Sequence, residues 1–202
     1  MANRSFLYAS DRVPTRTGKE PIRFFGISEY KWDIPVAFKL LLSGNPRPCP
    51  SSIWRLKKDI AIVADLEAGT AALERFLVRI DEARTHWLVQ ETRDCMEAFR
   101  QKAPYVVLEA GELFELTDIP IPKQIDVLLR DIQGVESSAK YEAAVNAVNV
   151  GPPRKSRLLA RLVGAKLSVN PIHAMYKLGL GEWSDTLSIH PNSGGESPET
   201  DG

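Results

Sequence analysis

The sequence predicts an α+β fold, a single domain in which a small mixed or antiparallel sheet packs with several helices. Short apolar segments typical of strands are mixed with longer segments of helical spacing, and no regular strand–helix–strand alternation is present. The 202 residues suit one domain, and a hydrophobic fraction of 44% is ordinary for a globular protein. We expect this domain to span residues 1–191, followed by a flexible tail over residues 192–202 that has no apolar side chain.

Strand-like segments occur at five places. In the first, Phe6 and Tyr8 alternate with Ser5 and Leu7, which places the two pairs on opposite faces of a strand. The predicted strands are residues 4–10, 23–29, 59–64, 105–108 and 183–190. The polar loop between the first two contains prolines and a glycine, so these strands can pair as a hairpin with a long loop.

The rest of the chain is expected to be organised around residues 26–46. An apolar strand here leads into a polar, aromatic corner and then into a short helix. Pro35 suits the first position of that helix, and Gly44 suits a left-handed residue at its end. The side chains between them are almost all apolar, so the helix is expected to be buried and to depend on tertiary packing. The proline-rich residues 44–52 are predicted to be irregular.

Longer helices are predicted where apolar residues form stripes of helical period. One follows Asp65, which suits an N-cap, and continues to about Ile80. The next spans residues 82–102, with Leu88, Cys95 and Phe99 on its buried face. Further helical segments are predicted over residues 122–134, 138–148 and 154–164.

Composition predicts a reduced, cytoplasmic protein. Two cysteines are too few for a disulfide framework, no apolar run approaches the roughly 18 residues of a membrane span, and the N-terminus lacks the apolar core of a secretory signal. The 26 basic and 26 acidic residues give a net charge of zero, which argues against a general nucleic-acid-binding protein.

Most catalytic and cofactor signatures are missing from the sequence. His86, His173 and His190 are far apart and lack the spacing of metal ligands, so we expect no metal and no cofactor. His86 and Cys95 point to opposite sides of one predicted helix, which excludes a local thiolate–imidazolium pair. No phosphate-binding glycine motif and no Gly-x-Ser-x-Gly motif occurs.

Two groups of residues are candidates for binding. Acidic residues recur every third position from Glu109 to Asp118, and no basic residue occurs between positions 103 and 122. They are interpreted as a solvated helix face, as a docking surface for a basic partner, or as a site with Glu109 as a general base. Aromatic residues on the polar corner either anchor an interface or cover the short helix. The candidate partner-binding residues are Glu29, Tyr30, Trp32, Asp33, Glu109, Glu112, Glu115, Trp183 and Asp185.

Several motifs indicate a family. They are Met1-Ala-Asn-Arg-Ser-Phe-Leu-Tyr8, Ile34-Pro35, Leu42-Ser-Gly-Asn-Pro46, Leu108-Glu-Ala-Gly-Glu112 and Gly181-Glu-Trp-Ser184. With them the chain resembles an uncharacterised family of bacterial cytoplasmic proteins. Small α+β bacterial proteins of this kind are often immunity proteins encoded beside polymorphic toxins, and the resemblance implies no catalytic residue.

These observations favour a protein-binding module, an immunity protein that neutralises a bacterial toxin by direct binding. The first alternative is a small carboxylate-dependent hydrolase with Glu109 as base, assisted by His173 or Asp185. The second is RNA binding through a basic helix. The basic residues of that helix are Arg154, Lys155, Arg157, Arg161 and Lys166.

Overall fold

A computed structural model describes residues 3–16, 21–54, 58–149, 170–184, 186–189 and 191. In this part of the chain, five strands form one antiparallel sheet in the order β2-β1-β5-β4-β3. The strands are β1 Arg4–Ser10, β2 Phe24–Lys31, β3 Arg47–Cys49, β4 Ala61–Asp65 and β5 Tyr105–Glu109. The α+β prediction is confirmed, and the sheet is the antiparallel one of the two kinds expected.

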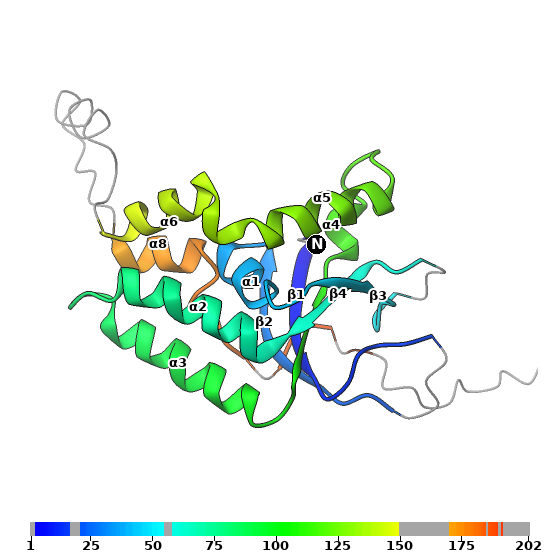
Figure 1. Ribbon diagram of the computed structural model, residues 1–202, viewed down its shortest axis with the longest axis horizontal. Helices are drawn as coiled ribbons and strands as arrows, with labels where there is room; N and C mark the ends of the chain where they lie inside the picture. The colour runs from blue at the N-terminus through cyan, green and yellow to red at the C-terminus, as the bar shows by residue number, and fades with distance from the viewer. Residues whose placement is uncertain are drawn as a thin grey trace, which may run out of the picture.

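Helices make up most of the remaining described chain. They are α1 Val36–Leu41, α2 Leu66–Ile80, α3 His86–Arg100, α4 Gly111–Phe114, α5 Ile121–Gln133, α6 Ala139–Asn149 and α8 Pro171–Lys177. A short 3-10 turn, η1, covers Val135–Ser137. Figure 1 shows α1 in the middle of the helical layer, with α2 and α3 on one side of it and α5, α6 and α8 on the other.

The two faces of the sheet are covered differently. Strand residues such as Leu7 and Leu108 face the helices and join a large core to which all the long helices contribute. Their neighbours Tyr8 and Val107 face the other way and contact smaller apolar clusters. Ile53, Trp54, Leu187 and Ile189, all from loops, cover that second face. We call it the outer face.

The expected hairpin between the first two strands is present. Ser10 pairs with Phe24 at its loop end and Arg4 with Lys31 at its open end. A bulge opposite Leu7 and Tyr8 places one extra residue in β2, which increases the local twist. The strand β5 then inserts between β1 and β4, far from both hairpin strands in sequence.

The short helix α1 is buried as predicted, but its two ends differ from the prediction. Ala37, Phe38, Leu40 and Leu41 are 0% exposed. Pro35 precedes the helix in extended conformation instead of occupying its first turn. The left-handed residue after the helix is Asn45, with φ of 55°, and Gly44 has no positive φ.

Other boundaries also differ from the prediction. The strand β3 lies within residues 44–52, which were expected to be irregular; its Pro48 is tolerated because β3 is an edge strand. Of the strand expected over residues 183–190, the described residues form one bridge, between Trp183 and Ser28. Cys95 is half-buried, and the neighbouring Met96 occupies the core. The predicted helix over 154–164 and the tail over 192–202 lie outside the described residues.

Two glycines allow α1 and α2 to approach closely. A Cβ atom at position 69, in α2, would overlap the carbonyl group of Leu41 at the end of α1. A Cβ atom at Gly44 would overlap the carbonyl oxygen of Asp65, just before α2. The backbones of the two helices are therefore in direct contact, and no larger residue fits without displacing one of them.

Replacing Gly69 with alanine is expected to destabilise the protein by about 2–3 kcal/mol, because the backbone at Leu41 must move. At an ordinary helix position the same change stabilises by about 1 kcal/mol. Ala71, exposed on the same helix, gives the matched control, and Ala71→Gly should cost about 1 kcal/mol. Urea denaturation followed by circular dichroism measures both. Wild-type stability of Gly69→Ala would contradict the close contact.

Candidate functional site

An exposed tryptophan marks the corner between β2 and α1. Trp32 is 60% exposed and has a left-handed backbone with φ of 68°. Its N–H donates to the carbonyl oxygen of Asn3 at 2.8 Å. The Ser5 hydroxyl donates to the Asp33 carbonyl at 2.7 Å, and the Asp33 carboxylate accepts the N–H of Ile34 at 2.7 Å. The corner is therefore fixed on both sides of the tryptophan.

The conformation of Trp32 is unfavourable for folding alone. A left-handed conformation costs a residue with a side chain about 1–2 kcal/mol. The indole is also mostly in water, so burial does not offset that cost. An exposed aromatic side chain held in a strained backbone is a physical reason to look for function at this corner.

A groove of about 380 Å³ lies beside this corner. Its lining residues are Arg4, Glu29, Tyr30, Lys31, Tyr176, Lys177 and Glu182. We call it the corner groove. One side comes from the ends of β1 and β2 and the other from the end of α8 and the chain just after it. The Tyr30 hydroxyl donates to the Lys177 carbonyl at 3.1 Å, which ties the two sides together.

Two of the predicted binding residues shape the groove. Tyr30 is half-buried, with its ring edge-on to Phe38, and burial raises the pKa of its hydroxyl. Glu29 lies 3.2 Å from the Arg4 Nε and accepts hydrogen bonds from the N–H and hydroxyl of Ser188. Burial alone would raise the pKa of Glu29, but the Ser188 hydrogen bonds and nearby positive charges lower it below its ordinary value. Glu29 is thus ionised and engaged within the protein.

The predicted acidic run does not form one surface. Glu109 is 0% exposed at the end of β5. Glu112, in α4, accepts the N–H of Arg4 at 2.8 Å and fixes the start of β1. Glu115 is exposed beyond α4. The run therefore crosses a strand end, a short helix and a loop, so a continuous acidic helix face is absent.

The second aromatic candidate has a structural role. The Trp183 ring is half-buried against the main core, and its Nε1–H donates to the Thr92 hydroxyl of α3 at 3.1 Å. Its backbone forms the bridge to Ser28 in β2. Trp183 thus joins α3 to the edge of the sheet. Asp185 lies outside the described residues.

Glu109 holds a loop against the outer face of the sheet. Its carboxylate accepts the Ser51 hydroxyl at 2.8 Å and the Ser52 N–H at 2.6 Å, and the N–H of Ile53 is a further donor. Burial raises the pKa of Glu109 to about 7 although these three hydrogen bonds act to lower it. His173 lies on α8 in the helical layer, on the opposite side of the sheet. The structure therefore does not bring together the carboxylate and histidine of the hydrolase alternative.

This buried carboxylate should make stability depend on pH. A glutamate in the unfolded chain titrates near pH 4.3, so between about pH 4.3 and 7 the folded state binds the proton more tightly. The contribution of Glu109 is therefore largest below about pH 4.3 and is lost as the pH rises through 7. The gap between the two pKa values corresponds to about 3–4 kcal/mol. In Glu109→Gln, which keeps an acceptor oxygen, this part of the pH dependence should disappear.

Urea denaturation across pH 5 to 8 measures the effect as a difference between two proteins. Relative to wild type, Glu109→Gln should gain stability as the pH rises. Glu115→Gln, at an exposed site, is the control and should follow the wild-type curve. Parallel curves for wild type and Glu109→Gln would contradict the raised pKa.

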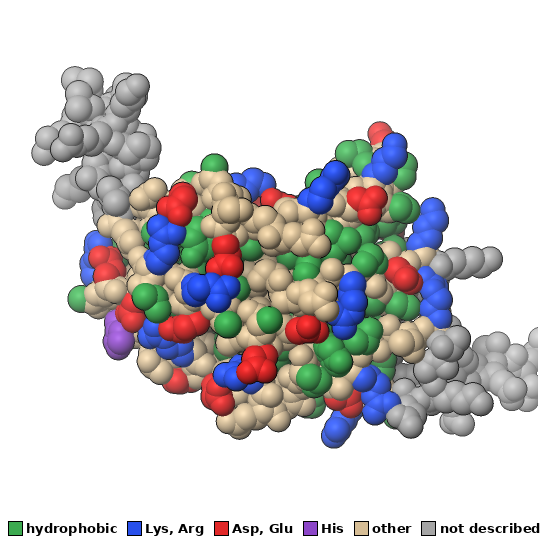
Figure 2. Space-filling model, in the orientation of Figure 1, with side chains coloured by type: hydrophobic (Ala, Val, Ile, Leu, Met, Phe, Trp, Pro, Cys, Tyr) green, Lys and Arg blue, Asp and Glu red, His purple; other side chains and the backbone are tan. Residues whose placement is uncertain are grey.

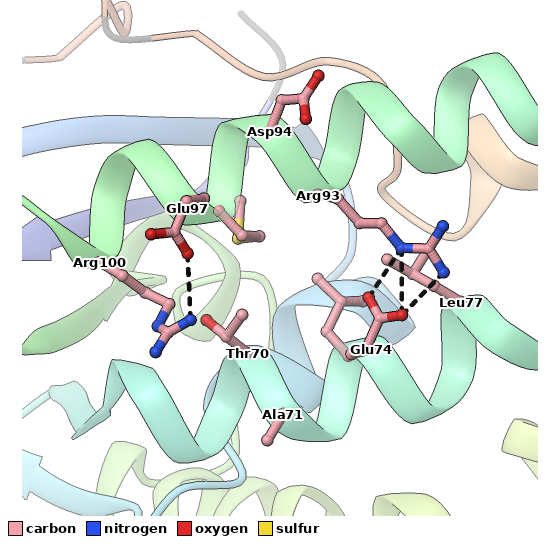
Figure 3. A pocket seen from close by; sticks show the side chains of 10 residues that line it. Thr70, Ala71, Glu74, Leu77, Arg93, Asp94, Glu97 and Arg100 are labelled. Atoms are coloured by element: carbon pink, nitrogen blue, oxygen red, sulfur yellow. Dashed lines mark hydrogen bonds and ion pairs between the residues drawn. The ribbon is translucent and has the colours of Figure 1, made fainter.

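A second hollow of about 400 Å³ lies between α2 and α3 (Figure 3). Arg93 reaches from α3 to Glu74 on α2, with nitrogen–oxygen distances of 2.8–3.1 Å, and Arg100 pairs with Glu97 at 3.2 Å. The hydroxyl oxygen of Thr70 is buried there without a hydrogen-bond partner. The arginines of the hollow are already paired with neighbouring carboxylates. A ligand that entered it would therefore contact mainly apolar surface.

The helical side of the molecule carries charges of both signs, interleaved (Figure 2). Many of them pair between elements, as Arg75 does with Glu136 and Arg79 with Glu142. Among the described residues, no group of three or more His, Cys, Asp or Glu side chains is placed to hold a metal ion. Within that same part of the chain, none of the helices has the length and apolarity needed to cross a bilayer.

Comparison with known protein families identifies the family of this chain. Residues 11–151 match the family described as Domain of unknown function (DUF7822). The chain belongs to the DUF7822 family. No curated protein and no solved structure matches it. The DUF7822 match includes Trp32 and Glu109, whereas Arg4 and Tyr176 of the corner groove lie outside it.

Sequence reasoning missed five of the seven residues that line the groove in this DUF7822 protein. Arg4, Lys31, Tyr176, Lys177 and Glu182 line it but were not candidates. Lys31 adjoins the predicted aromatic corner, and this adjacency was the available signal. The position of Tyr176 and Lys177 depends on where α8 packs, which no local pattern reveals. The basic residues from 154 to 166, proposed for RNA, lie outside the described residues.

Proposed function

We propose that this protein is a protein-binding module that contacts its partner through the corner groove, with Trp32 as the central side chain. The observation that carries the proposal is the exposed indole on a strained, well-fixed corner. Tryptophan is among the residues that contribute most to binding energy at protein interfaces. A backbone already fixed by hydrogen bonds on both sides of the tryptophan loses less conformational entropy on binding.

The predicted candidates divide into two groups under this proposal. Tyr30 lines the groove, and Trp32 and Asp33 are exposed at the corner that directly follows the lining residue Lys31, so these three are assigned to the partner. Glu29 lines the groove and pairs with Arg4. Glu109, Glu112 and Trp183 are held by contacts within the protein, so we assign them to structure. Glu115 is exposed on the α4–α5 loop and is not part of the groove.

The finer proposal is that the partner is a bacterial toxin domain and that the protein is its cytoplasmic immunity protein. This rests on the general association of small α+β bacterial proteins with immunity to polymorphic toxins. An immunity protein acts by occupying the toxin surface, so a rigid anchor beside a polar groove suits such a role.

The test begins with capture of partners from native cells by the tagged protein and their identification by mass spectrometry. The affinity of a purified partner is then compared for wild type, Trp32→Ala and Trp87→Ala. Trp32→Ala should weaken binding by about 30-fold or more, as expected for a central interface residue. Trp87, 53% exposed on α3 and not part of the groove, is the matched control and should change affinity little. Equal affinity of wild type and Trp32→Ala would contradict the proposal.

The toxin assignment is tested separately in cells. Expression of the captured partner alone should stop growth, and co-expression of the wild-type protein should restore it. The Trp32→Ala protein should restore growth poorly, although circular dichroism shows it folded. A partner that is harmless when expressed alone would remove the immunity role and leave the binding role intact.

A further inference from the structure

The acidic and basic side chains of the corner groove differ in how far they are paired within the protein. Three are basic, Arg4, Lys31 and Lys177, and two are acidic, Glu29 and Glu182. The carboxylate of Glu29 is already engaged by Arg4 and by Ser188. The basic groups, in contrast, retain donors that no group among the described residues accepts.

Arg4 is the most informative of the three. Its side chain is 27% exposed, and its Nε lies 3.2 Å from Glu29 in an ion-pair contact that lacks hydrogen-bond geometry. Within the described residues, its two terminal nitrogens have no hydrogen-bond partner. A guanidinium fork is suited to bind both oxygens of a carboxylate at once. The two terminal nitrogens of this partly exposed arginine are therefore available to an acceptor from outside.

The two lysines occupy the two sides of the groove. Lys31 ends β2 and Lys177 ends α8, and both are exposed. In the described part of the chain, neither ammonium group makes an ion pair or a hydrogen bond. Glu29 balances part of this positive charge, since nearby Arg4 and Lys31 lower its pKa, and both ammonium groups keep donors for an anion in the groove.

We propose that the corner groove receives an acidic segment of the protein partner, with a carboxylate bound between Arg4 and the two lysines. This inference rests on the proposed function and specifies the chemistry of the partner. An acidic partner is the opposite of the basic partner expected from the sequence. Two of the carboxylates predicted to bind a basic partner are engaged within the protein, because Glu109 is buried and Glu112 accepts the N–H of Arg4. An apolar or aromatic side chain next to the acidic segment would then rest on Trp32.

The acidic residues at the groove favour a peptide over a nucleic acid. Glu182 is an exposed lining residue, and Asp33 is exposed two residues after the lining residue Lys31; both carboxylates would repel a continuous polyanion. A peptide carries separated charges and can place one carboxylate on the basic side chains while polar groups face the acidic ones. The net charge of zero also provides no general attraction for a nucleic acid.

The probe is a fluorescein-labelled hexaglutamate peptide, with hexaglutamine as the neutral control and the full chain as the receptor. Fluorescence anisotropy should show saturable binding of hexaglutamate at low salt, weakening as salt is added, and none of hexaglutamine. The Lys31→Gln/Lys177→Gln protein should bind about fivefold or more weakly, since both changes are at exposed positions that do not disturb folding. Lys123→Gln, an exposed lysine on α5, is the matched control and should bind as wild type does.

Three results would overturn the proposal. They are absence of hexaglutamate binding at low salt, equal binding by the double lysine variant, and equally tight competition by inorganic phosphate, which would show an unselective anion site. Failure here is distinguishable from failure of the binding role. A captured partner whose affinity depends on Trp32 but not on Lys31 and Lys177 would preserve the binding module and refute the acidic segment.

Discussion

The backbone contact between α1 and α2 is the constraint on which the rest of the structure depends. At Gly69 the second helix lies directly against the carbonyl group of Leu41, and Gly44 gives the connecting chain room beside Asp65. A six-residue helix cannot persist alone, so it exists because this contact and the surrounding core hold it. The side chain of Lys39 adds an ion pair to Asp131 of α5 at 2.5 Å, which fixes α1 from the other side.

Both sides of the corner groove are positioned by α1. The chain must pass from β2 into this fixed helix within a few residues, and the left-handed Trp32 makes that turn. On the other side, the N–H of Ala37 donates to the carbonyl of Leu178 at 2.9 Å, which places the end of α8. Gly179, with φ of 82°, packs against Pro35 where a Cβ would collide. The left-handed backbone of Trp32 is thus a consequence of the fixed position of α1. This backbone conformation leaves the indole exposed.

Local sequence patterns correctly predicted the strands and helices whose side-chain spacing determines them. The alternation around Phe6 and Tyr8 and the stripes of the long helices follow directly from the side-chain periods of strands and helices. Gly44 was assigned a left-handed role because glycine usually has it, whereas Asn45 takes that conformation and Gly44 serves close packing. Whether a glycine provides a left-handed turn or a close packing contact depends on which helix lies opposite it in the fold. For the same reason only two of the seven groove residues, Glu29 and Tyr30, were predicted. The corner is a local feature of the sequence, whereas the opposite wall of the groove is formed by the end of α8 and the chain after it.

Glu109 shows how a charged residue can be wrongly assigned to the surface. Tyr105, Val107 and Glu109 alternate along β5, so extending the strand by one residue places the carboxylate on the same face as Val107. The predicted strand ended at Leu108, so Glu109 was not assigned to that face. Loops cover the outer face there, and a loop brings unpaired N–H and hydroxyl groups that need acceptors. A carboxylate accepting from Ser51, Ser52 and Ile53 satisfies those donors, so burying Glu109 helps to close a face that loops cover in the described part of the chain.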